Sequence, residues 1–181
     1  MDNFFLRAIS KTIDLFTTGK IGNDEAERIG KSDYWWACGK HKNYYSRVIS
    51  KGDVYQFDFG KNLEPEMSYE HRGLVIGKSG QLVYVLPIFS YISGKHNDIY
   101  NPKTNPKGKL YLLESRTYAF LKHDSVLKLN DIRTVSTKRI MYQQTNGHIN
   151  IKTDAYAEIE ELAFSHYFPT FHYELMKYKS R

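Results

Sequence analysis

Residues 131–140 contain the densest group of phosphate-binding side-chain types in the chain. Three cations and three hydroxyl side chains fall within seven residues: Arg133, Thr134, Ser136, Thr137, Lys138 and Arg139. Guanidinium and hydroxyl groups donate hydrogen bonds to phosphate oxygens, so this pattern is typical of an anion site. A basic edge strand or a salt-bridged turn has the same composition, because charged runs often form solvated faces. Both interpretations are open at this point.

Other residue types with chemical potential are too dispersed to form a site. Cys38 and His41 have half of a zinc-ligand spacing, but no second pair of Cys or His accompanies them. His166 and His172 are separated by Pro169 and indicate no ligand geometry. The chain also lacks a glycine-rich phosphate loop and a Gly-x-Ser-x-Gly elbow. We therefore expect no metal or nucleotide cofactor.

The composition is that of one ordinary globular domain with a basic surface. The 181 residues are 41% hydrophobic and 25% charged, which predicts a packed core and excludes a disordered chain. The net charge of +6 favours nucleic acid, an acidic protein segment or a membrane surface as partner. Fifteen tyrosines among 26 Lys and Arg residues suit unpaired bases, and they suit a β-rich core equally well.

Sequence features that depend on the cellular compartment predict a soluble cytoplasmic protein. Cys38 is the single cysteine, so no disulfide can form within the chain, as in a reducing interior. The first residues lack the basic leader, apolar run and cleavage site of a signal peptide. No apolar run approaches the roughly 18 residues that a membrane-spanning helix needs.

The two ends of the chain predict helices. Residues 2–18 have amphipathic periodicity, with Asp2 or Asn3 as the cap and Gly19 as the end. A second, short helix is expected at residues 23–29, and residues 31–46 are expected to be a loop that packs its aromatic side chains across the main domain. Near the other end, a helix over residues 155–167 begins after Thr153 and stops at Pro169, and further helical turns cover residues 171–179.

The middle of the chain predicts short strands at 54–59, 73–77, 82–88, 110–113, 125–129 and 132–135. A hairpin turn is expected at residues 78–81, and residues 91–109 are expected to form an exposed loop. Short strands at this spacing indicate a small barrel. The predicted organisation is a helical extension with an aromatic loop over residues 1–47, and a barrel domain with a C-terminal helix over residues 48–181.

Three segments resemble, in this order, the MazF/PemK (Kid-like) family of bacterial toxins. They are residues 52–59 (GDVYQFDF), residues 71–76 (HRGLVI) together with residues 85–90 (VLPIFS), and residues 124–140 (DSVLKLNDIRTVSTKRI). The family has a Gly-Asp before an alternating strand, an arginine before an apolar strand, a strand that ends in Pro-apolar-Thr-Ser, and an Ile-Arg-Thr stretch with a basic tail. The resemblance covers about residues 51–142. It implies a small SH3-like β-barrel of the MazF/PemK/CcdB type.

The resemblance also implies an activity and partners. The family members are toxins of type II toxin–antitoxin systems, and they cleave single-stranded RNA without a metal or another cofactor through a 2′,3′-cyclic phosphate. Carried over to this chain, the resemblance implies a homodimer and an acidic antitoxin protein as partner. No membrane partner is expected.

The resemblance assigns Arg72 as the residue that stabilises the phosphate charge and Ser90 as a hydrogen-bond donor to the same phosphate. His71 adjoins Arg72 and matches no firm family position, but its type suits proton transfer at neutral pH. Surface pairing with Glu70 is the structural alternative for Arg72. Further residues are expected to contact the substrate: Arg133, Ser136, Lys138, Arg139, Glu66 and Glu70, of which the two glutamates are also rival bases.

Three positions depart from the family pattern. Gly73 replaces the proline after the arginine, Phe89 replaces the threonine before Ser90, and Ser136 replaces an acidic residue. The arginine and serine parts of the site therefore survive better than its acid–base parts. Two alternatives without catalysis follow: a barrel that binds a protein target, as a gyrase-poisoning relative does, and a plain RNA-binding barrel.

Overall fold

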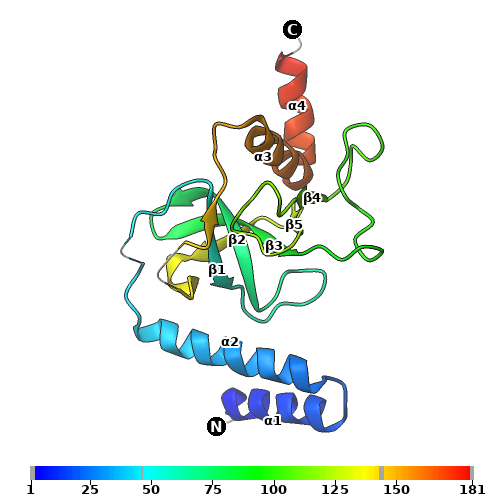
Figure 1. Ribbon diagram of the computed structural model, residues 1–181. Coiled ribbons are helices and arrows are strands. Elements are labelled where there is room, and N and C mark those ends of the chain that lie inside the picture. The colour runs from blue at the N-terminus through cyan, green and yellow to red at the C-terminus, as the bar shows by residue number, and fades with distance from the viewer. Residues whose placement is uncertain (1–2, 46, 143–144, 180–181) are drawn as a thin grey trace.

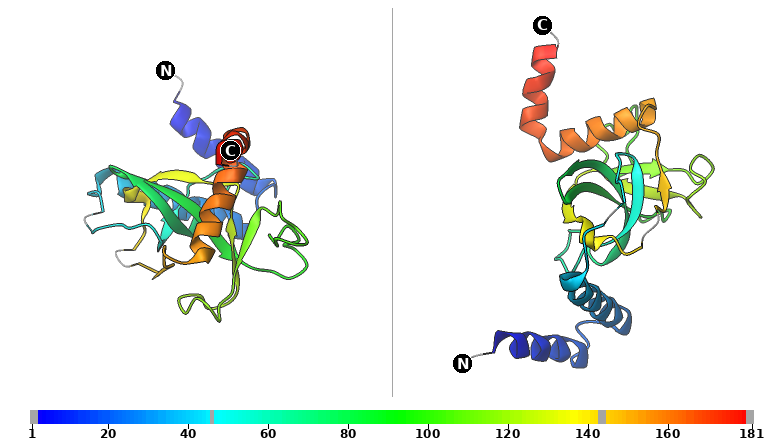
Figure 2. Two further views of the ribbon diagram at one scale, coloured as in Figure 1. Left: turned by 90° about the horizontal axis from the view of Figure 1, so that it is seen from above. Right: turned by 90° about the vertical axis from the view of Figure 1, so that its left-hand side faces the viewer.

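The apolar runs in the middle of the chain form a curled antiparallel sheet in the computed structural model, which describes residues 3–45, 47–142 and 145–179. Two helices lie at one end of the sheet and two at the other (Figures 1 and 2). The strands are β1 (Asp53–Asp58), β2 (Glu70–Ser79), β3 (Leu82–Ser90), β4 (Leu110–Leu113), β5 (Ser125–Lys128), β6 (Arg133–Ser136) and β7 (Gly147–His148). All strands predicted from the sequence are present, and β7 was not predicted.

The sheet curls because β3 has two partners along its length. The strand order is β4-β5-β3-β2-β1-β7, and β6 pairs with β3 outside this path. Leu82–Val85 of β3 pair with β6, whereas Ile88–Ser90 pair with β5. After β6, the 3₁₀ turn η1 (Thr137–Arg139) leads back to β1, where Ile140 bridges Phe57. The antiparallel, curled sheet with helices is confirmed; the SH3-like description stays an interpretation.

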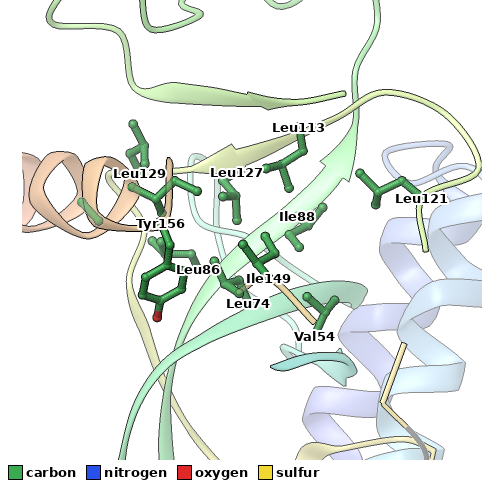
Figure 3. Close-up of a cluster of buried hydrophobic side chains, with 12 residues drawn as sticks. Val54, Leu74, Leu86, Ile88, Leu113, Leu121, Leu127, Leu129, Ile149 and Tyr156 are labelled. Carbon is green, nitrogen blue, oxygen red and sulfur yellow. The ribbon is translucent and has the colours of Figure 1, made fainter. Parts of the chain in front are cut away.

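The two faces of the sheet bury separate apolar clusters, as the two-residue period of strands requires. Val54, Leu74, Leu86 and Ile88 pack on one face with Tyr156 of the helix α3 (Asp154–Tyr167; Figure 3). On the other face, the buried side chains include Phe57, Val75, Val83, Val85 and Ile140. Consecutive residues of β2 therefore contribute to opposite faces.

The first helix agrees with its prediction, whereas the second is much longer than predicted. α1 (Phe4–Thr17) is capped by Asn3, whose side chain accepts hydrogen bonds from the backbone of Phe5 and Leu6; Asp2 lies outside the described residues. α2 (Asn23–His41) includes most of the segment predicted as a loop.

The loop prediction was wrong for residues 31–41, because Gly30 and Gly39 do not interrupt the helix. Each costs a helix only about 1 kcal/mol. The Lys31–Glu27 pair, one turn apart at 2.6 Å, and the contact of buried Ser32 with the sheet offset part of that cost.

The C-terminal region forms two successive helices. α3 (Asp154–Tyr167) starts after Thr153, whose side chain accepts a hydrogen bond from the Tyr156 amide, as predicted. α4 (Pro169–Lys179) begins at the proline, which fits the first position of a helix because no N–H is needed there. Among the described residues, no helix has both the length and the apolar character needed to span a bilayer.

Candidate functional site

Several polar side chains meet in a pocket of about 300 Å³ where β1, β2 and β3 adjoin the start of β5. We call it the Arg72 pocket. Its lining residues are Gln56, Glu70, His71, Arg72, Ile88, Phe89, Ser90, Lys122, His123 and Ser125. Arg72, Ser90, His71 and Glu70, which were singled out from the sequence, are thus brought together. Lys122 and His123 were missed.

Strand register explains why Arg72 and Ser90 share this pocket. Arg72 pairs with Gln56 on β1 and with Ile88 on β3, so these three residues lie on one face. Ser90 follows two positions after Ile88 and returns to that face. Ser90 in turn pairs with Ser125 on β5.

The positive charge of Arg72 is poorly compensated by the described residues around it. Its Nη1 donates a 3.3 Å hydrogen bond to the Phe120 carbonyl oxygen. Among residues 3–45, 47–142 and 145–179, no carboxylate lies within ion-pair distance of it, so the surface pairing with Glu70, the structural alternative for Arg72, is not present. A guanidinium has five N–H donors, and most of those of Arg72 are available to an anion.

His123 lines the Arg72 pocket beside Ser90. Its Nε2 lies 2.8 Å from the Ser90 Oγ. Its loop is fixed by Asp124, whose Oδ1 accepts hydrogen bonds of 2.8 Å from both the amide and the hydroxyl of Ser115. These bonds, the backbone one first, hold the pKa of Asp124 below its usual value. His123 is therefore well positioned although its side chain is exposed.

His71 lies differently from its neighbour Arg72. Its register partner Phe57 belongs to the second apolar cluster, so the His71 side chain leaves β2 on the face opposite that of Arg72. Burial first, and the nearby charge of Arg28 on α2 second, lower the pKa of His71 below its ordinary value. The imidazole is consequently neutral at pH 7.

Arg133 lies outside the Arg72 pocket and has acidic partners. Its Nε is 2.6 Å from Asp131 Oδ1, and its Nη2 is 3.4 Å from Glu66 Oε2. The side chain also contacts the Met67 carbonyl oxygen at 3.4 Å. Because Arg133 pairs with Val85, it lies beside the half of β3 that is remote from Ser90. Its pairing with Asp131 corresponds to the salt-bridged turn considered from sequence.

The remaining basic residues of this segment line a different hollow, beside α2. Ser136 accepts a hydrogen bond from the Lys138 amide and so caps η1. Arg139 donates from Nη1 to the Asp58 carbonyl oxygen at 2.9 Å. Lys138 Nζ lies 4.7 Å from the ring centre of Tyr44. The structure therefore does not bring Ser136, Lys138 and Arg139 to Arg72.

Two departures from the family pattern have local structural reasons. A Cβ at Gly73 would lie 2.2 Å from Val85 Cγ1 and 3.1 Å from Phe57 Cδ2, so no side chain fits there. Phe89 packs edge-on against the ring of His96, with 5.1 Å between ring centres.

In the described part of the chain, no three His, Cys, Asp or Glu side chains gather as a metal site would require.

No family model matches the sequence, and no curated protein matches it. Among solved structures, the chain is similar to the Mycobacterium tuberculosis toxin MazF-mt6, with 13% sequence identity and a TM-score of 0.40. The match covers 62% of this chain and 96% of that one. A likeness this distant assigns neither a family nor an activity.

Proposed function

We propose that the protein is a toxin-like endoribonuclease that cleaves single-stranded RNA without a metal ion. The observation that carries this proposal is the Arg72 pocket, in which an arginine with no carboxylate partner among the described residues adjoins the hydrogen-bonded Ser90–His123 pair. The order of the three sequence segments that resemble MazF/PemK toxins supports the same activity. The phosphodiester of RNA supplies a negative charge that can pair with the Arg72 guanidinium, and the adjoining ribose supplies a reactive 2′-hydroxyl.

The reaction needs no protein nucleophile. The 2′-oxygen attacks the adjacent phosphorus, the O2′–P bond forms and the P–O5′ bond breaks. This gives a 2′,3′-cyclic phosphate and a 5′-hydroxyl. One proton leaves the 2′-hydroxyl and one is gained by the 5′-oxygen, so charge balances.

Each side chain of the pocket has a role in this scheme. Arg72 binds two non-bridging oxygens as their negative charge grows, and Ser90 donates a hydrogen bond to the phosphate. His123 Nε2–H then donates to the Ser90 Oγ, so Nδ1 of His123 removes the 2′ proton, which later returns to solvent. Lys122 stabilises the leaving 5′-oxygen until that atom is protonated by water. His123 thus takes the role that the sequence suggested for His71.

A homodimer and an acidic antitoxin remain parts of this proposal. The net charge of +6 suits an acidic partner, because complementary charge speeds association and disfavours wrong partners. Sedimentation of the purified protein, alone and with the product of a neighbouring acidic reading frame, tests both. A monomer at all concentrations would contradict the dimer.

The central test compares RNA with a substrate that cannot react. The protein is incubated in EDTA with a single-stranded RNA and with the same oligonucleotide carrying 2′-deoxy sugars, and the products are identified by mass spectrometry. We expect cyclic-phosphate products from the ribose substrate alone. Binding of RNA without cleavage under any condition would refute the ribonuclease and favour a non-catalytic barrel.

A further inference from the structure

α2 lies across one end of the curled sheet (Figure 1) and encloses two hollows of about 310 and 240 Å³ against it. The two hollows have three lining residues in common: Trp35, Asp58 and Met141. The smaller hollow also shares Glu70 and His71 with the Arg72 pocket. These shared walls place the three hollows in a row. We call the two hollows beside α2 the α2 groove.

Polar contacts, rather than apolar packing, hold α2 to the sheet. Ser32, the one buried residue of α2 in the described part of the chain, donates from Oγ to Asp58 Oδ1 at 3.0 Å. Just after the helix, Lys42 Nζ donates to the Ile140 carbonyl oxygen at 2.8 Å. Between these contacts the interface stays open. Such a groove can admit a ligand without loss of a hydrophobic core.

The α2 groove has an excess of positive charge. Six cations line it: Arg28, Lys31, Lys40, Lys42, Lys138 and Arg139. Two carboxylates oppose them, Asp58 and Glu70, and Asp58 already accepts hydrogen bonds from Ser32 and from the Gly60 amide. Within the described ranges, Lys40 and Lys138 have no carboxylate at ion-pair distance. Their charge is available to phosphates.

Aromatic rings lie among these cations. Trp35 and Trp36 both line the larger hollow, and Trp36 is 58% exposed. Lys40 Nζ lies 4.9 Å from the centre of the Trp36 ring, and Lys138 lies over Tyr44. Exposed rings beside cations are how proteins hold single-stranded nucleic acid, with bases on the rings and phosphates on the charges. An acidic peptide would use the cations but has no flat base for the indoles.

We propose that the α2 groove binds the stretch of single-stranded RNA that flanks the cleaved phosphate. Its bases stack on Trp35 and Trp36, and its phosphates contact Lys40 and Lys138. The inference deepens the proposed function, since it relies on that function for the position of the reacting phosphate in the Arg72 pocket. The N-terminal extension is then part of the substrate site.

The two tryptophans of the chain make the groove directly observable, because both lie in it. A random-sequence 12-mer of 2′-O-methyl RNA, which cannot be cleaved, is titrated into the full-length protein. Tryptophan fluorescence and the anisotropy of a 5′-fluorescein label are followed together. We expect quenching that tracks binding, and binding about 5- to 100-fold weaker in Trp35→Leu. Lys138→Ala, on the sheet side of the groove, should lower the salt slope of log K by about 0.7.

Lys152→Ala is the matched control, because it removes one exposed charge outside the groove. Binding without a change in tryptophan fluorescence, or equal affinities of Lys138→Ala and Lys152→Ala, would overturn the inference. So would quenching by a Glu-rich peptide but not by RNA, which would assign the groove to a protein partner. RNA binding in the groove without cleavage of ribose RNA would refute the proposed function alone. Cleavage that Lys138→Ala and Trp35→Leu leave unchanged would refute this inference alone.

Discussion

Replacement of His123 by alanine is the sharpest probe of the Arg72 pocket. The imidazole lies 2.8 Å from the Ser90 hydroxyl and is exposed, so it supports the fold very little. Loss of one exposed hydrogen bond should change the free energy of unfolding by at most about 1 kcal/mol. Loss of a group that transfers a proton costs a factor of about 10² to 10⁴ in rate, or roughly 2.7 to 5.4 kcal/mol of barrier. The effect on the rate therefore exceeds the effect on stability.

The assay is the initial rate of cyclic-phosphate formation at saturating RNA, from pH 5 to 9, with urea unfolding measured on the same samples. His123→Ala should lower this rate at each pH by the factor expected for loss of a proton-transfer group. Added imidazole should restore part of the rate, since it can fill the space of the missing ring. His148→Gln is the control, because this exposed histidine is hydrogen-bonded to Asp53 at 2.9 Å, outside the pocket lining. A His123→Ala rate within threefold of wild type would refute the assignment.

Three further results follow from the same geometry. Arg72→Ala should lower kcat/KM for RNA cleavage by a factor of roughly 10² to 10³. Arg72→Lys should fall between wild type and Arg72→Ala, because lysine keeps the positive charge but loses the bidentate guanidinium. Equal rates for the two variants in the cleavage assay would exclude bidentate binding. Because the pKa of His71 is lowered in the folded state, the unfolded chain takes up a proton first as pH falls below about 6.5. Urea unfolding should therefore show a smaller free energy of unfolding at pH 5.5 than at pH 7.5. This decrease should be smaller in His71→Gln. Gly73→Ala should destabilise the fold by about 1 to 3 kcal/mol in thermal unfolding, because the added Cβ would meet Val85. Gly30→Ala has open space around it and should stabilise α2 by about 1 kcal/mol. An unchanged stability of Gly73→Ala would show that β2 can shift.

Local patterns in the sequence were sufficient for most elements and insufficient for their partners. The alternation of residues 54–59 and the apolar runs of residues 73–77 and 82–88 predict β1 to β3, because strand period and burial are local properties. The extent of α2 depends on Ser32 reaching Asp58, a contact between residues 26 positions apart. β7 consists of two residues that exist as a strand only through pairing with Asp53 and Val54. No sequence window contains such information.

The same limit applies to the pocket. Arg72 and Ser90 were found through their motifs, and the β2–β3 hairpin brings their strands together. His123 has no motif of its own, and its place beside Ser90 depends on the pairing of β3 with β5 over an intervening long loop. In the sequence, Lys122 and His123 directly precede the third segment that resembles the toxins, at residues 124–140, and this position is what could have pointed to them.

The contrast between Arg133 and Arg72 shows why the density of donors is a poor guide to an anion site. Residues 131–140 contain more cations and hydroxyls than the neighbourhood of Arg72 does, yet Arg133 lies against Asp131 and Glu66. Arg72 stands in a stretch of ordinary composition but meets one carbonyl oxygen and no carboxylate in the described ranges. Binding of a phosphate depends on the charge that the protein leaves uncompensated, because a paired guanidinium must first give up its partner. We therefore expect Arg133→Ala to affect stability more than cleavage, and Arg72→Ala to do the reverse.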